Sequence, residues 1–99
     1  MARETSASIA DWGAETFGAV SDFAVLVARA RLEFEELDAA VRAGDGDEIG
    51  KEAADVMILL HRLCGLLGKD LAGEVDAKMQ INRARRWIAS GDGVGRHKD

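Results

Sequence analysis

The sequence predicts an all-α fold, an antiparallel bundle of about four helices. The chain lacks proline and tyrosine, and its apolar content of 47% consists mainly of Ala, Leu and Val, which favours helices over strands. Apolar residues recur at helical intervals in four segments, and glycines separate these segments. Short connections favour antiparallel neighbours. The 99 residues fit one domain, residues 1–99, in which 1–5 and 91–99 are expected to be flexible.

Residues 6–17 are expected to form a short packing helix. A second, longer helix is expected to start at Ser21 or Asp22, either of which can act as N-cap, and to stop at Gly44. One side of this helix carries an apolar stripe of Phe23, Val27, Ala30, Phe34, Leu37 and Val41. The opposite side carries a second apolar strip of Val25, Leu32 and Ala39. A helix with two apolar faces needs two packing partners.

The third helix is expected over about 47–67, and it is apolar nearly all round between Val56 and Leu60. This segment should therefore lie at the centre of the bundle. The fourth helix starts with Asp70 as N-cap and fades near Trp87 into a glycine-rich tail. Four short helices cannot cover all of these apolar faces, which favours a homo-oligomer, either a homodimer or a homotetramer.

Charge and hydropathy exclude several classes of protein. The net charge of −5 repels nucleic-acid backbones and anionic membranes, so no nucleic-acid polymer and no membrane is expected as a partner. The longest apolar run has six residues, far fewer than the ~20 that span a bilayer, and no signal-peptide pattern is present, so a cytoplasmic location is expected. Cys64, His61 and His97 do not make a zinc set or a catalytic dyad, and any metal must be bound by oxygen.

Two acidic pairs occur on consecutive helices. Glu33 and Glu36 lie on adjacent turns at one margin of the second helix's stripe, whereas Glu35 projects away from it. Glu52 falls within the apolar stripe of the third helix, and Asp55 lies at its edge. In an antiparallel hairpin the two pairs can approach each other. Four neighbouring carboxylates partly out of water require protons or a cation, and Mg²⁺ supplies that neutralisation.

Two interpretations without a metal stay open at this point. The acids can be solvated groups on charged helix faces, because surface carboxylates are common. Alternatively, Glu52 can pair with an arginine such as Arg29 or Arg62 across the bundle.

The order and spacing of the acids resemble a known family. Glu33-x-x-Glu36, then fifteen residues, then Glu52-x-x-Asp55 is similar to the ExxE and ExxD signature of MazG-like nucleotide pyrophosphohydrolases, in the all-α NTP pyrophosphatase superfamily. The stretches KEAADVMILLHRL and KMQINRARRW also resemble family segments. The resemblance covers roughly residues 9–97. Family members commonly carry a second glutamate where this chain has Leu32, which leaves the number of metal ions open.

The resemblance implies hydrolysis of a nucleoside triphosphate between its α and β phosphates, giving the monophosphate and pyrophosphate, in a housecleaning role. It implies that the four acids hold Mg²⁺, or Mn²⁺, and that one of them, Glu33 or Glu36 by preference, can accept a proton from water. Lys78 and Asn82 share a face of the fourth helix, and Arg85 follows one turn on. We expect these three residues to contact phosphate or sugar.

Two alternatives remain at the level of function. A helical interaction or regulatory module would use the acids, or the strip of Val25, Leu32 and Ala39, to bind a partner, and would show no Mg²⁺-dependent turnover. A phosphoribosyl-ATP pyrophosphohydrolase-like enzyme would keep the chemistry and change the substrate. Trp12 and Trp87 could stack on a base, but tryptophans at helical spacing more often pack against a neighbouring helix, so neither is assigned.

Overall fold

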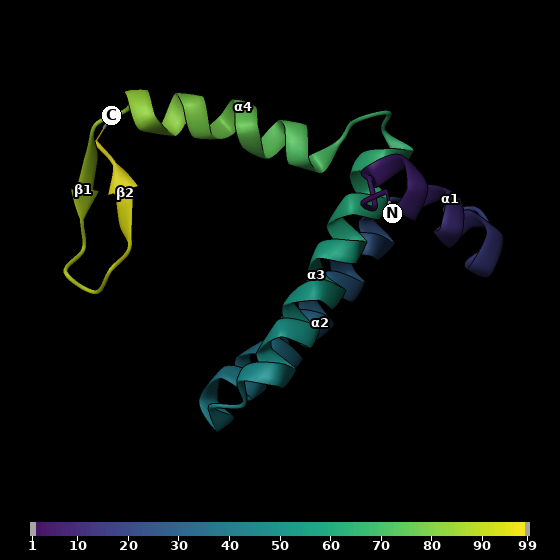
Figure 1. Cartoon of the computed structure of the whole chain (residues 1–99), viewed down its shortest axis with the longest axis horizontal. Helices are drawn as coiled ribbons and strands as arrows, with labels where there is room; N and C mark the ends of the chain where they lie inside the picture. Colours follow the sequence, from purple (N-terminus) through teal and green to yellow (C-terminus); the bar gives the residue numbers. More distant parts are fainter. Residues whose placement is uncertain (1, 99) are drawn as a thin grey trace.

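The computed structural model describes residues 2–98 (Figure 1). Its elements, in chain order, are α1 (Ser6–Phe17), α2 (Ala24–Ala43), α3 (Gly46–Leu66), α4 (Leu71–Ala84), β1 (Trp87–Ala89) and β2 (Gly95–His97). The expected helical class and the expected four helices are confirmed. Met1 and Asp99, the outermost residues of the segments expected to be flexible, lie outside the described residues. No helix in the described part is long and apolar enough to cross a membrane.

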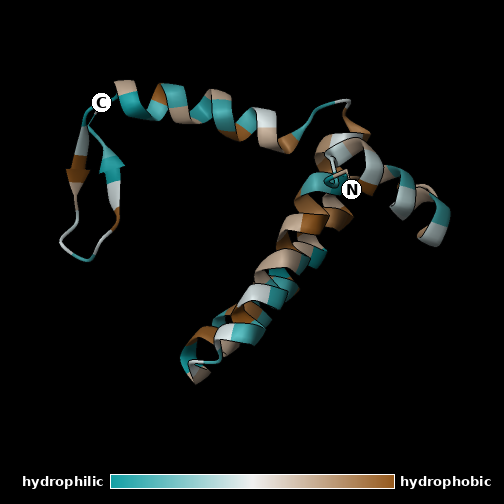
Figure 2. Cartoon of the chain, in the orientation of Figure 1, coloured by the Kyte–Doolittle hydropathy of each residue, from teal (hydrophilic) through white to brown (hydrophobic). Residues whose placement is uncertain are grey.

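Helices α2 and α3 form a long antiparallel hairpin, and α1 packs against α3 (Figure 1). Gly44 ends α2 in the left-handed conformation at φ 71°, and the Asp45 side chain caps α3 by accepting a hydrogen bond from the Glu48 amide. Figure 2 shows that hydrophobic residues are most continuous on the half of α3 nearer α1. Helix α3 thus contacts each of the other three helices, α4 the least, in agreement with its expected central position.

The starts of α2 and α4 show how accurately caps can be read from sequence. Helix α2 begins at Ala24, slightly later than the Ser21 or Asp22 start expected, although Asp22 Oδ1 accepts a hydrogen bond of 2.9 Å from the Ala24 amide. Asp70 is the N-cap of α4, as expected, and accepts a hydrogen bond from the Gly73 amide. Both short acidic side chains satisfy amides that the helix itself leaves free.

Ser6 joins three helices at one point. Its side chain is fully buried, and its hydroxyl oxygen accepts a hydrogen bond of 2.8 Å from the Leu71 amide and shares one of 2.8 Å with Nδ1 of His61. The Ser6 amide donates to Asp70 Oδ1 at 3.1 Å. The start of α1, the last turns of α3 and the start of α4 are therefore tied together.

Beyond this joint, α4 runs away from the other helices (Figure 1). The short connection between α3 and α4 predicts an antiparallel neighbour, and the structure differs in this respect. Hydrogen bonds from Ser6 hold the start of α4 at the end of α3, and sequence spacing does not reveal them.

A β-hairpin follows α4, and the sequence does not predict it. Strand β1 pairs antiparallel with β2, with Trp87 opposite His97, and the two rings meet edge to face at 5.9 Å. Gly91 and Gly93 in the turn adopt φ of 90° and 94°, a region that favours glycine. Each strand has three residues, too few for an alternating pattern to be recognised.

Candidate functional site

The α2–α3 hairpin brings three acidic side chains together. Glu33 and Glu36 come from α2 and Glu52 from α3, and each offers a carboxylate oxygen within 4.8 Å of the others. Glu33 is 9% exposed, Glu52 is half-buried and Glu36 is exposed. The expected approach of the two acidic motifs across the hairpin is thus found for these three residues, which we call the acid cluster.

Asp55, the fourth expected acid, is exposed and lies outside this group of three. It is still close enough for its charge to act on Glu52, because it contributes to raising the pKa of that carboxyl group. Asp55 therefore lies at the edge of the acid cluster, next to solvent.

Glu52 has an environment that a free surface carboxylate does not have. Among the described residues, its buried Oε2 atom has no hydrogen-bond partner. Burial, and after it the nearby carboxylates of Glu36, Asp55 and Glu48, together raise the pKa of Glu52 to about 6. A buried, unpaired carboxylate oxygen among like charges is unfavourable unless a cation or a proton compensates it.

The two arginines that offered an alternative partner for Glu52 are engaged elsewhere. Arg29 Nη2 lies 3.0 Å from Glu33 Oε1, one helical turn away. Arg62, only 8% exposed, donates to the Gly18 carbonyl at 3.2 Å, and its guanidinium lies 5.5 Å from the centre of the Phe17 ring. Pairing of Glu52 with either arginine is therefore not observed in residues 2–98.

The acid cluster suits a hard divalent cation. All of its donor atoms are carboxylate oxygens, the ligands that Mg²⁺ and Mn²⁺ prefer. The unpartnered Oε2 of Glu52 is the atom that most needs such a partner. Glu33, Glu36 and Glu52 can hold the ion, with Asp55 at the rim.

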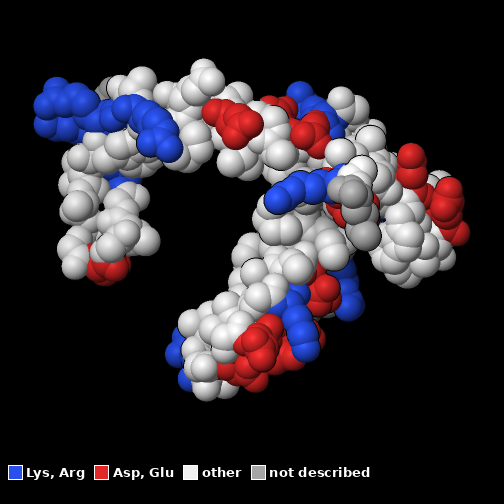
Figure 3. All heavy atoms as spheres, in the orientation of Figure 1, with Lys and Arg blue, Asp and Glu red and all other residues white. Residues whose placement is uncertain are grey.

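The expected phosphate-binding residues lie on α4 and at its C-cap, Arg85, away from the acid cluster within one chain (Figure 1). Lys78 and Arg85 are exposed, whereas Asn82 is half-buried, and its Oδ1 atom finds no partner among the described residues. Basic side chains gather over the far end of α4 and the adjoining hairpin (Figure 3). The segment 78–98 has six basic residues and one acidic residue, so a positive arm extends from a negative body.

A cavity between α1 and α3 was not predicted. It has a volume of about 280 Å³ and is lined by Glu4, Ile9, Trp12 and Ile58. Trp12 is 51% exposed and thus does not belong to the core, contrary to the usual role of a tryptophan at helical spacing. The sequence could not distinguish these roles, since both place the indole on the same helix face.

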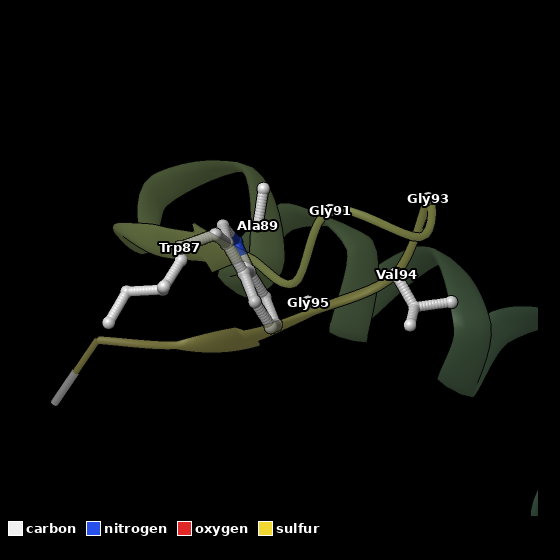
Figure 4. Close-up of a pocket in the computed structure, with 7 residues that line it drawn as sticks. Trp87, Ala89, Gly91, Gly93, Val94 and Gly95 are labelled. Atoms are coloured by element: carbon white, nitrogen blue, oxygen red, sulfur yellow. The ribbon is translucent and has the colours of Figure 1, made fainter.

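A second hollow lies on one face of the C-terminal hairpin (Figure 4). It is lined by Trp87, Ile88, Ala89, Gly91, Gly93, Val94 and Gly95. None of these side chains is titratable, so this hollow offers no acid, base or metal ligand.

Comparison with known proteins agrees with this geometry. The sequence model of the dATP/dGTP pyrophosphohydrolase family matches residues 5–98. A dATP/dGTP diphosphohydrolase of cyanophage S-2L is 42% identical over 71 residues, which are 72% of this chain and 64% of that protein. The chain thus spans less than two thirds of the length of that relative.

A solved structure is similar over nearly the whole chain. It is the cyanophage S-2L MazG-like pyrophosphohydrolase bound to dGDP and three catalytic Mn²⁺ ions per active site. The TM-score is 0.74 at 36% sequence identity, and the match covers 95% of this chain and 89% of that one. The MazG-like resemblance seen in the acid motifs is confirmed, and the chain belongs to the dATP/dGTP pyrophosphohydrolase family.

Proposed function

We propose that this protein is a Mg²⁺- or Mn²⁺-dependent pyrophosphohydrolase that acts on dATP and dGTP. It cleaves the bond between the α and β phosphates and releases the deoxynucleoside monophosphate and pyrophosphate. The observation that carries the proposal is the acid cluster, in which three carboxylates converge and Oε2 of Glu52 is buried without a partner. The names of the matching family and of the cyanophage relative support the choice of substrate.

In this mechanism Glu33, Glu36, Glu52 and Asp55 are the cation ligands. A divalent cation held there would neutralise phosphate charge and lower the pKa of a bound water molecule. Arg29 orients the Glu33 carboxylate through the 3.0 Å contact with Oε1, so Glu33 is positioned before any ligand arrives.

Glu36 is the better candidate for the group that accepts the proton of the attacking water. It is exposed, so water reaches it directly, whereas Glu33 is buried and held by Arg29. A carboxylate within hydrogen-bond reach of the water can take its proton as the bond to phosphorus forms.

Lys78, Asn82 and Arg85 bind phosphate or sugar in this proposal, and they do so from a second copy of the chain. In one chain α4 leads away from the acid cluster (Figure 1). Two observations support a homodimer or homotetramer. The arm is basic and the body acidic, and apolar side chains are exposed on both: Val25 and Leu32 on α2, and Val75, Met79 and Ile81 on α4.

The proposal is tested by incubating the protein with each deoxy- and ribonucleoside triphosphate and Mg²⁺ or Mn²⁺, and measuring pyrophosphate and orthophosphate separately. We expect pyrophosphate and the monophosphate from dATP and dGTP, and no turnover in EDTA. Glu52→Gln should lower the rate by at least about 100-fold. The matched control is Glu35→Gln, an exposed position on the same hairpin outside the acid cluster, which should keep full activity.

Orthophosphate as the product would place cleavage at another bond and contradict the proposal. Equal activity of Glu52→Gln and the unaltered protein would remove the acid cluster from the mechanism. Absence of turnover with every nucleotide would favour the helical interaction module.

A further inference from the structure

The cavity between α1 and α3 is outside the acid cluster, and the chemistry described above does not use it. We propose that it is the site of the purine base, in which Trp12 stacks on the ring and Glu4 selects guanine over adenine. This inference rests on the proposed function, because it concerns the base of the same nucleotide. It adds a specificity-determining pair of residues to that function.

The position of the cavity along α3 fits a nucleotide whose phosphates lie at the acid cluster. Glu52, Asp55 and Ile58 follow one another at steps of three residues on α3, and Ile58 lines the cavity. The rise from Glu52 to Ile58 is about 9 Å at 1.5 Å per residue. Each step of three residues also moves about 60° around the helix, so Ile58 lies on the face of α3 next to that of the acids. A deoxyribose with its α phosphate would follow this ridge from the acid cluster to the cavity.

The lining of the cavity suits a flat aromatic ligand. Ile9, Trp12 and Ile58 are apolar, and the volume of about 280 Å³ is just below the range of pockets that enclose a whole ligand. A cavity of this size fits one part of a ligand, such as its base. An exposed tryptophan face stacks on any base, and such stacking is a main source of affinity in nucleotide sites.

Trp12 is held in place before a base arrives. Its ring meets Phe17 edge to face at a centroid distance of 5.5 Å, and Phe17 in turn lies against the buried guanidinium of Arg62. Gly13 makes room for Arg62, because a side-chain Cβ there would lie 2.7 Å from Arg62 Cδ. An aromatic side chain fixed in this way loses little freedom when it binds a base.

Glu4 provides the selectivity between purines. Its Oε1 atom accepts a hydrogen bond of 2.7 Å from Ser8 Oγ, which orients the carboxylate at the cavity. Guanine presents two adjacent donors on its Watson–Crick edge, N1–H and the N2 amino group, and a carboxylate accepts from both. Adenine presents one donor, its N6 amino group, next to the lone pair of N1, and this lone pair and a carboxylate repel each other. Glu4 therefore favours guanine.

The test uses the full-length protein with saturating Mn²⁺, measuring kcat and KM for dGTP and dATP and, by calorimetry, the binding of dGDP. Trp12→Leu should raise KM for dGTP about ten-fold with little change in kcat, because it removes binding that substrate and transition state share. Glu4→Gln should lower the ratio of kcat/KM for dGTP over dATP about ten-fold, since an amide can pair with adenine. Glu15→Gln, exposed on α1, is the matched control and should leave that ratio unchanged.

The outcomes separate this inference from the proposed function. If the unaltered protein hydrolyses both purine nucleotides while Glu4→Gln keeps its selectivity and Trp12→Leu keeps its KM, the base site is wrong and the proposed function stands. If no nucleotide is hydrolysed but dGDP binds about ten-fold more weakly to both variants than to the unaltered protein, the base site stands and the proposed function fails. Circular dichroism shows whether the Trp12→Leu variant is folded. If that variant is unfolded, the selectivity of Glu4→Gln, a substitution at an exposed position, tests the base site.

Discussion

Replacement by alanine should have opposite effects on stability at two glycines of α3, because Gly65 lies in the contact with α1 and Gly50 does not. A Cβ atom added at Gly65 would lie 2.7 Å from Ala10 Cβ and still closer to the Ser6 carbonyl oxygen. The Ser6 carbonyl is backbone at the start of α1, so α1 must shift to make room. A Cβ atom added at Gly50 would meet nothing within 4 Å.

The magnitudes follow from two opposing effects. Replacing glycine by alanine inside a helix stabilises by about 1 kcal/mol. Overpacking costs about 1–3 kcal/mol, and the upper end applies where the obstacle is backbone. Gly65→Ala should therefore lose about 2 kcal/mol of unfolding free energy, which lowers Tm by about 10 °C for a chain of this size. Gly50→Ala should instead gain up to about 1 kcal/mol and melt a few degrees higher.

The assay is thermal and urea unfolding followed by circular dichroism at one protein concentration, because assembly makes Tm depend on concentration. Displacement of α1 also moves Trp12 relative to Ile58, so Gly65→Ala should raise KM for dGTP while Gly50→Ala does not. If Gly65→Ala melts at or above the temperature of the unaltered protein, the close α1–α3 contact does not exist in solution.

Three further predictions concern charge. Without divalent cations, Glu52→Gln should raise Tm, because it removes one of three mutually repelling carboxylates. The variant should also lose the rise in Tm that Mg²⁺ or Mn²⁺ gives to the unaltered protein. A lower Tm of the variant in EDTA would contradict the repulsion. Cation affinity measured by calorimetry should fall as the pH is lowered through about 6. Burial, the larger cause, and the charge of Glu36 raise the pKa of Glu52 to about 6, so protons compete with the cation there. An affinity independent of pH would refute this. The pKa of Asp70 is lowered below 3.8, mainly by the hydrogen bond from the Ser6 amide. The stability that Asp70 contributes is therefore present above that pH and is lost as the pH falls below it. Asp70→Asn should therefore flatten the acid limb of an unfolding curve against pH, and an unchanged limb would argue against the Ser6–Asp70 bond.

Local patterns were enough to predict the helices and the convergence of three acids. The N-cap at Asp70 and the left-handed glycine at Gly44 act within a few residues of the chain, so the sequence shows them directly. Glu36 and Glu52 meet because two helices joined by a short turn must run antiparallel. These features depend on spacing alone.

The features that could not be predicted depend on contacts between distant residues. The start of α4 is held by hydrogen bonds between Ser6 and residues 64 and 65 positions away. The exposure of Trp12 depends on how α1 crosses α3, which periodicity does not determine. Asp55 shares the i, i+3 spacing of the other acids but is exposed to solvent. Its position depends on the offset between α2 and α3, which the spacing of the acids does not determine.

The joint at Ser6 has a mechanical consequence. Helix α4 has 14 residues, so it is a lever of about 21 Å whose start is held by the hydroxyl and amide groups of Ser6. A tilt of about 10° at that point would sweep Arg85 through roughly 4 Å, more than the length of a hydrogen bond. If Lys78 and Arg85 bind phosphate as proposed, the accuracy of that contact is set at the opposite end of the helix, by the hydrogen bonds of Ser6.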